Sequence, residues 1–463
     1  MSPQQKESLA QEAGTLFRRL FPICRSLTGP GVRQSLEILR EVAFFHRHEI
    51  PSGTQVFDWI VPDEWRLKRA RLWDDQGALL LDSDQNNLHV LNYSIPFDGV
   101  VGFAELDPHL HTLPHLPQAI PYRTSYYTRD WGFCLSHRQY EALDRAGRYR
   151  VQIETELAPG ILDYGDCLTG AEEAPREYLF STYICHPSLA NDNLSGPILW
   201  VLLLRALQGR RLKNRYRFVI IPETIGAVAY LACHGHALGR VQGGYVLSCV
   251  AGPGILGYKQ SLAAFRGAPV LVDRAAMTTL AELDLAHRIY PFDIHGSDER
   301  QYSLPAWRIP VGSLHASKYY EYDEYHTSLD NLDFVRPERL VDMLELYLMV
   351  VEKLERNATY RSLLPQSEAM LGKRGLYPAT GGSLMQPAAA ALADHGQRRF
   401  LVDAEKTLHG SRIDAMLWLM MLADGQMDLL AIAQQTGIAF SALADAADLL
   451  CCHGLLAVAQ EES

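Results

Sequence analysis

Three short stretches of the sequence place histidine and carboxylate side chains where strands of a sheet would end. The first, EYLFSTYICHPSLANDNLSG (177–196), opens with an apolar run that predicts a buried strand, and His186-Pro187 ends it. Asp192 follows just before an apolar segment that predicts a buried helix. Ligands bind open α/β sheets at such strand ends, and imidazole with carboxylate is a common pair of zinc ligands. This stretch therefore indicates a metal site.

The second stretch, RFVIIPETIGAVAYL (217–231), ends an apolar run at Pro222-Glu223 and continues as a helix. Glu223 thus lies at another strand end, beside the first stretch if the two strands are neighbours. A carboxylate there can bind a metal or act as general base for a water molecule. The third stretch (295–331) concentrates polar residues in a loop-like region, namely His295, Asp298, Glu299, Arg300, His315 and His326. Thr327 and Asp330 are placed to orient the ring of His326.

Each motif also has an ordinary structural explanation. Asn-Asp-Asn before a helix is good N-cap chemistry, and His-Pro is common in turns. Glu223 in the first turn of a helix would favour the helix dipole. With 17 histidines in the chain, most must be core or surface residues. Cys185 beside His186 does not predict a thiol protease, because adjacent strand residues point to opposite faces.

Length and composition limit the classes of protein to be considered. A chain of 463 residues predicts two or three domains, and a net charge of -11 argues against non-specific binding to nucleic acid or anionic membranes. The apolar runs are too short to span a bilayer. The eight cysteines show no CxxC spacing, so we expect reduced thiols and a cytoplasmic protein.

The pattern of elements predicts an α/β protein with a mostly parallel sheet covered by helices. Strands near 178–184, 216–221 and 244–250 alternate with helices near 195–208 and 224–238. We predict this domain over 1–58 and 135–361, including a strand near 148–157, with a small β-rich domain inserted at 59–134. A Gly-, Pro- and Ala-rich linker follows at 362–396.

The C-terminal residues 397–463 predict a winged-helix-like domain from a helix, a Gly turn, a second helix and a short strand. Residues 421–463 contain acidic residues but no Lys or Arg. DNA reading needs basic residues, so we expect this domain to pack against a protein partner or a second copy of the chain.

Four motifs, in their order along the chain, together resemble the M28-type zinc aminopeptidases: HPSLANDNLSG, PETIG, GSDERQYS and YHTSLDN. More closely, the chain resembles the DUF4910 aminopeptidase-like family, whose members carry an inserted DUF2172 segment and a C-terminal winged helix. VFDWIVPDEW, NNLHVLNYS, LHTLPHLP and IPYRTSYYTRDWGFC resemble that inserted segment. The resemblance covers nearly the whole chain.

The resemblance implies a role for each matching residue. His186 and His326 resemble the histidine ligands, Asp192 the metal-binding carboxylate, and Glu223 the general base. Ser297-Asp298 resembles a loop that supports the site. Two usual carboxylate ligands are absent, because Thr224 follows Glu223 and because Cys249 stands where an aspartate is usual.

A third departure is His186-Pro187-Ser188, which lacks the acid of the usual His-x-Asp. We therefore expect one Zn²⁺ per chain, held by His186, Asp192 and His326 with water in the fourth position. Cys249 is an alternative extra ligand, but a buried inert thiol is the favoured interpretation.

The predicted function is hydrolysis of an amide bond by a zinc-activated water, as in an aminopeptidase, with Glu223 as base. Glu299 would bind a substrate's amino group and Arg300 a carboxylate, although both fit a surface ion pair equally well. One alternative is an amidase or acyl-transfer enzyme acting on a polysaccharide or natural-product intermediate. The other is a non-catalytic scaffold stabilised by a metal.

Overall fold

The computed structural model describes residues 1–283, 285–376 and 412–459. The chain divides into two compact units. The first comprises 1–272 and 288–347, and the second comprises 273–287 and 348–463. The predicted linker (362–396) and the predicted C-terminal domain (397–463) lie partly outside the described residues.

The first unit is built on an eight-stranded mixed sheet with the order β1-β10-β12-β11-β13-β16-β14-β15. The four central strands, β12, β11, β13 and β16, are parallel neighbours, as predicted, while β1, β10 and β14 join the sheet antiparallel. The strands are β1 His46–Pro51, β10 Ile161–Gly170, β11 Glu177–Tyr183, β12 Arg215–Ile221, β13 Val241–Val246, β14 Leu256–Lys259, β15 His287–Tyr290 and β16 Val311–His315.

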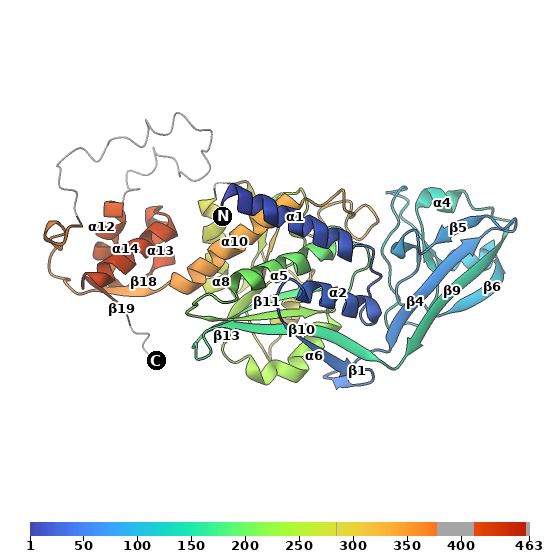
Figure 1. Ribbon diagram of the computed structural model, residues 1–463, viewed down its shortest axis with the longest axis horizontal. Helices are drawn as coiled ribbons and strands as arrows, with labels where there is room; N and C mark the ends of the chain where they lie inside the picture. Colours follow the sequence, from blue (N-terminus) through green and yellow to red (C-terminus); the bar gives the residue numbers. More distant parts are fainter. Residues whose placement is uncertain (284, 377–411, 460–463) are drawn as a thin grey trace, which may run out of the picture. The chain divides into compact units, whose positions relative to one another are not determined.

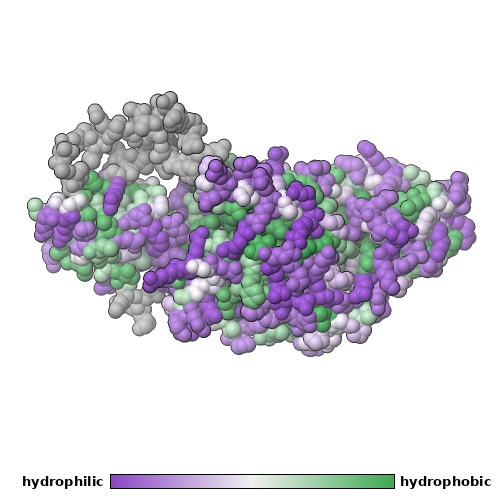
Figure 2. Space-filling view, in the orientation of Figure 1, coloured by the Kyte–Doolittle hydropathy of each residue, from purple (hydrophilic) through white to green (hydrophobic). Residues whose placement is uncertain are grey.

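Helices cover both faces of this sheet (Figure 1). Helices α1 (Pro3–Leu20), α2 (Pro30–Arg40) and α5 (Ser195–Leu207) lie on one face, and α6 (Ile225–His234) lies on the other. Every residue of β11 is buried, which explains why its sequence is a continuous run without alternation. Helix α1 buries only one side, and its outer side is hydrophilic in Figure 2.

Further helices are α3 Phe103–Leu106, α4 His137–Glu141, α7 Leu262–Phe265, α8 Leu271–Glu282, α9 Glu299–Tyr302 and α10 Pro337–Arg356.

A second, four-stranded antiparallel sheet with the order β5-β4-β9-β6 forms the inserted β-rich part. Its strands are β4 Glu64–Trp73, β5 Leu79–Asp82, β6 Phe97–Gly102 and β9 Arg148–Ala158. Two-stranded pairs are formed by β2 Gln55–Val56 with β3 Trp59–Ile60, and by β7 Leu110–His111 with β8 Phe133–Cys134.

Strand β9 is placed differently from the sequence prediction, which assigned 148–157 to the α/β domain. It pairs with β4 and β6 and buries Tyr149, Val151 and Ile153. Alternating burial predicts a strand but not its partner, so the sequence could not show which sheet it joins. We therefore propose that the inserted part runs from about 52 to about 160.

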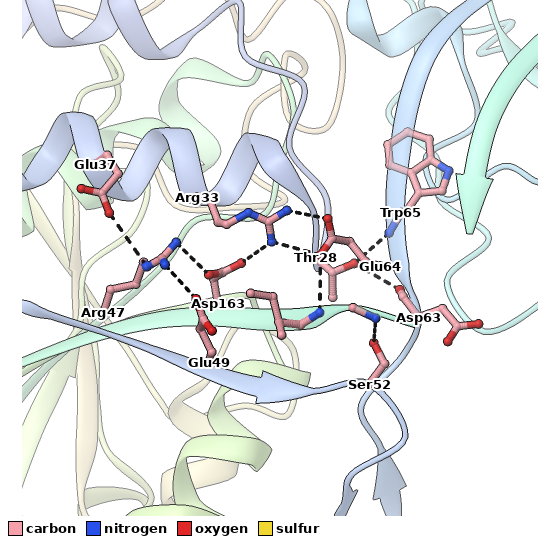
Figure 3. A network of polar contacts seen from close by, with 12 residues as sticks. Thr28, Arg33, Glu37, Arg47, Glu49, Ser52, Asp63, Glu64, Trp65 and Asp163 are labelled. Atoms are coloured by element: carbon pink, nitrogen blue, oxygen red, sulfur yellow. Dashed lines mark hydrogen bonds and ion pairs between the residues drawn. The ribbon is translucent and has the colours of Figure 1, made fainter. Parts of the chain in front are cut away.

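Polar contacts fix the base of the inserted part to the α/β part (Figure 3). Arg33 of α2 donates to Glu64, the first residue of β4, at 3.0 Å and to Asp163 of β10 at 2.9 Å. The backbone N–H of Ser52 donates to the carbonyl of Gly160 at 2.9 Å, and the N–H of Gly160 donates back to the Ser52 hydroxyl at 3.0 Å. The two connections of the inserted part are thus tied to each other and to α2.

The second unit contains the helices α12 (Arg412–Leu422), α13 (Leu429–Thr436) and α14 (Phe440–Cys452) and a three-stranded sheet. Gly437, at φ 70°, ends α13, and this helix, turn and helix match the prediction of a winged helix. The sheet order is β18-β17-β19, with β18 Asp424–Asp428 and β19 Leu456–Val458. The central strand β17 (Thr359–Ser362) comes from before the predicted linker, which sequence alone did not reveal.

Among the residues described, no helix combines the length and the apolar composition that crossing a lipid bilayer requires.

Candidate metal centre

Three predicted metal ligands meet at the end of the parallel strands, although His326 is far from the other two in the sequence. His186 lies just past β11, Asp192 lies in the turn that enters α5, and His326 lies in the loop after β16. One ligand atom from each of the three side chains lies within 4.8 Å of the other two. His186 and Asp192 are buried, whereas the His326 side chain is 33% exposed. The cluster is therefore open on the side of His326.

The donor atoms of this triad fit a zinc ion. His326 Nε2 lies 2.9 Å from Asp192 Oδ2, yet neither that nitrogen nor His186 Nδ1 has a hydrogen-bond partner in the described protein, although both are buried. Buried polar atoms are almost always paired, so unpaired imidazole nitrogens beside a carboxylate indicate a missing ligand. Two imidazoles and one carboxylate form a common catalytic zinc set, with one position open.

The protonation states also suit metal binding. Burial lowers the pKa of His186 to about 4, so the ring is neutral at neutral pH. Burial opposes ionisation of Asp192, but His186, His326 and the hydroxyl of Tyr183, which donates to Asp192 Oδ1 at 2.5 Å, together lower its pKa to about 2. A neutral imidazole and an ionised carboxylate are the forms that bind metals.

Glu223 lies beside the triad, directly after β12. Its Oε2 is 3.6 Å from His186 Nε2. Burial and the charge of Asp192 raise the pKa of Glu223 to about 7, the range suited to a general base. The next residue, Thr224, has φ 63° and ψ -74°, a strained conformation for a β-branched residue. The Thr224 N–H donates to Asp298 Oδ1 at 2.8 Å, so the Ser297-Asp298 loop holds this turn.

The two nearby cysteines are buried thiols. Against our expectation from strand alternation, Cys185 does lie with His186 and Glu223, and their ligand atoms are within 4.8 Å of one another. The reason is that β11 ends at Tyr183, so the pleat no longer sets the direction of these side chains. Burial raises the pKa of Cys185 and of Cys249 well above the ordinary value, which keeps both thiols protonated. Among the described residues, Cys249 belongs to neither cluster of metal-ligand side chains.

The two predicted substrate-binding residues mainly contact their own loop. Glu299 is buried, and its Oε2 accepts from the Ser297 N–H at 2.9 Å, while its Oε1 is unpaired. Its charge nevertheless raises the pKa of Glu223, so it lies within electrostatic reach of the base. Arg300 donates to the Ser297 carbonyl at 3.4 Å. Binding of a substrate by Glu299 and Arg300 stays a prediction.

Asp330 acts differently from the sequence prediction. It accepts hydrogen bonds from the backbone N–H groups of Asn191 (2.6 Å) and Asp192 (2.9 Å) rather than from the ring of His326. Thr327 likewise caps its own turn by donating to the Glu324 carbonyl at 2.8 Å. The sequence therefore identified Asp330 as a residue near the site, but only the fold shows that it orients the Asp192 loop.

Sequence reasoning missed aromatic residues of the site, among them Tyr122, which comes from the inserted part. Its ring packs edge-on against His186 and against His326, with centroids 5.1 Å and 5.3 Å apart. Tyr325 also stacks on His326 at 4.0 Å. Nothing in the local sequence around Tyr122 distinguishes a loop at a metal site from any other loop.

Comparisons with known proteins identify the family of the chain. Residues 15–357 match the family described as "Domain of unknown function (DUF4910)", and residues 400–458 match a winged helix-turn-helix family. The chain is 38% identical over 447 residues, 96% of each chain, to a "Putative polysaccharide biosynthesis protein with aminopeptidase-like domain" from Clostridium acetobutylicum.

Two solved structures are similar to this chain in fold. The crystal structure of a "putative peptidase" from Clostridium acetobutylicum is 36% identical, with a TM-score of 0.86 and 98% of each chain covered. A zinc aminopeptidase from Bacillus subtilis shares the fold, with a TM-score of 0.54 at 14% identity over 74% of this chain and 95% of its own.

Proposed function

This chain belongs to the DUF4910 family, and from that premise we propose that it is a zinc-dependent hydrolase that cleaves an amide bond, in the manner of an aminopeptidase. The observation that carries the proposal is the convergence of His186, Asp192 and His326 within 4.8 Å, with the Glu223 carboxylate beside them. Relatives described as peptidases or as aminopeptidase-like support a hydrolase, and a zinc aminopeptidase with the same fold supports zinc.

His186, Asp192 and His326 would hold one zinc ion, which supplies a lowered water pKa and a polarised substrate carbonyl when bound. Glu223 accepts a proton from the attacking water and then donates it to the nitrogen of the leaving amine. The raised pKa of Glu223 suits both steps, because a group with a pKa near 7 can accept and release a proton at neutral pH. Asp298 and Asp330 position the Glu223 turn and the Asp192 loop.

A second candidate is an amidase or acyl-transfer enzyme that acts on a polysaccharide intermediate. It is favoured by the relative from Clostridium acetobutylicum, which is described as a "Putative polysaccharide biosynthesis protein with aminopeptidase-like domain". It is also favoured by the departure of Thr224 and Cys249 from the ligand pattern of aminopeptidases that bind two metals.

The experiment that tests the proposal combines metal analysis with Glu223→Gln. The wild-type protein is expected to bind about one zinc per chain and to release amines from a panel of aminoacyl and N-acyl amides. Glu223→Gln should retain zinc but lose at least about 100-fold in hydrolysis, the usual contribution of a general base. Glu368→Gln, an exposed loop substitution, is the matched control. Full activity of Glu223→Gln with zinc bound would refute the mechanism, and cleavage of N-acyl amides alone would select the second candidate.

A further inference from the structure

The inserted β-rich part reaches both histidines of the candidate zinc site. We propose that it acts as a clamp, in which residues 86–94 and 119–125 hold the loops of His186 and His326 at the separation that zinc binding needs. This inference rests on the proposed function, since it concerns the same site, but it assigns to the inserted part a role in building the metal centre.

On the His326 side, the inserted part forms a short antiparallel bridge with the loop that carries the histidine. The Tyr122 N–H donates to the His326 carbonyl at 2.8 Å. The Ser328 N–H donates to the Ile120 carbonyl at 2.8 Å, and the Ile120 N–H donates to the Ser328 hydroxyl at 3.0 Å. Pro121 and Thr327 are paired residues between these bonds. The backbone of His326 is therefore held directly by the inserted part.

On the His186 side, the contacts pass through neighbouring residues. The buried Arg25 donates from Nε to the His186 carbonyl at 2.9 Å, and its own carbonyl accepts from Asn92 Nδ2 at 3.0 Å. Asn87 donates from Nδ2 to the hydroxyl of Ser188, two residues after the histidine, at 2.8 Å. Two asparagines of the inserted part thus fix the turn that carries His186.

The ring of Tyr122 connects the two sides. It is nearly perpendicular to both imidazoles, at 78° to His186 and 87° to His326, and the two imidazole centroids are 5.2 Å apart. Tyr122 is buried, so its ring limits how far either imidazole can turn. Tyr122 is accordingly a positioning residue, because it acts on the reaction only through the histidines.

The base of the inserted part is held as well. Arg33 of α2 contacts Glu64 and Asp163, and these contacts fix the base against α2. Figure 3 shows them. A part fixed at its base and bonded through residues 86–94 and 119–125 to both histidine loops has one docked position. Because ligand binding stabilises the state that contains the site, zinc should stabilise the docked position, and docking should strengthen zinc binding.

The test measures zinc affinity by competition with a chelator, together with the rise in unfolding temperature that zinc causes. Full-length wild type, Tyr122→Ala, Tyr122→Phe and Tyr127→Ala are compared. Loss of a residue that orients metal ligands typically weakens metal binding by about 10- to 100-fold, and we expect this of Tyr122→Ala. Tyr122→Phe keeps both ring contacts and should bind zinc as the wild type does. Tyr127 is exposed and lies five residues after Tyr122, so Tyr127→Ala is the control.

Asn87→Ala supplies a second measurement that does not disturb the buried ring. It removes the hydrogen bonds that Asn87 Nδ2 donates to the Ser188 hydroxyl and to the Pro22 carbonyl. Loss of the bond to Ser188, which holds the turn of His186, should weaken zinc binding by about 3- to 10-fold. Wild-type zinc affinity in both Tyr122→Ala and Asn87→Ala would overturn the clamp while leaving the proposed hydrolase intact. A wild-type protein that binds no zinc would overturn both, and zinc binding without hydrolysis would overturn only the proposed function.

Discussion

Substituting Asp330 by Asn tests how the Asp192 loop is held. The two oxygens of Asp330 each accept one backbone N–H, from Asn191 at 2.6 Å and from Asp192 at 2.9 Å, and the side chain is fully buried. Asparagine has nearly the same shape but only one acceptor oxygen. Its amide NH₂ group would face one of the two N–H donors, which then has no partner.

The expected cost follows from these contacts. Leaving a buried N–H unpaired costs roughly 1–3 kcal/mol, so Asp330→Asn should lower the free energy of unfolding by about 2 kcal/mol. In an equilibrium constant, about 2 kcal/mol is a factor of about 30. Because the same N–H groups orient Asp192, we expect zinc binding to weaken by about 10- to 100-fold.

Urea unfolding of the zinc-free protein measures the first effect, and chelator competition measures the second. Asp333→Asn is the matched control, because Asp333 lies in the same loop and is exposed. If Asp330→Asn equals Asp333→Asn in both stability and zinc affinity, then the two hydrogen bonds do not hold the metal-binding loop, and our account of Asp330 is wrong.

Two further predictions concern groups next to the triad. The charge of Glu299 contributes to the raised pKa of Glu223, so Glu299→Gln should lower that pKa. Because a general base must be unprotonated, activity is lost as pH falls through this pKa, and the acid limb of kcat/KM should move to lower pH in Glu299→Gln; an unmoved limb would contradict the coupling. Burial keeps the Cys249 thiol protonated, so Cys249→Ser should retain about one zinc per chain with unchanged affinity, as judged by metal analysis. A tenfold loss of zinc affinity in Cys249→Ser would instead identify this thiol as a ligand.

Much of the fold could be predicted because its central strands are buried on both faces. Continuous apolar runs such as β11 and β12 have no polar alternation, which is typical of parallel strands covered by helices. The strands outside the eight-stranded sheet were harder to assign. β9 shows clear alternation and was recognised as a strand, but its partners β4 and β6 are distant in sequence. β17 was separated from its sheet by the predicted linker.

The candidate site was predictable to the extent that its chemistry is local. His186 with Pro187, and Glu223 with Pro222, each mark the end of an apolar run, and side chains at that edge of a parallel sheet meet. Cys185 shows the limit of this reasoning: the alternation rule holds only within a strand, and β11 ends at Tyr183, two residues before Cys185. Asp330 was chosen correctly as a polar residue of the site but was given the wrong hydrogen-bond partner.

The sequence by itself determined the α/β class, the inserted part, the helix–turn–helix near the C-terminus and the residue types available to bind a metal. These depend on periodicity, turn chemistry and side-chain type, which are properties of short segments. Only the tertiary structure decided that Tyr122, Asn87 and Asn92 reach the loops of the two histidines. Such contacts join segments separated by as many as 204 residues, as between Tyr122 and His326. No local pattern encodes them, because they arise only when the two sheets are packed.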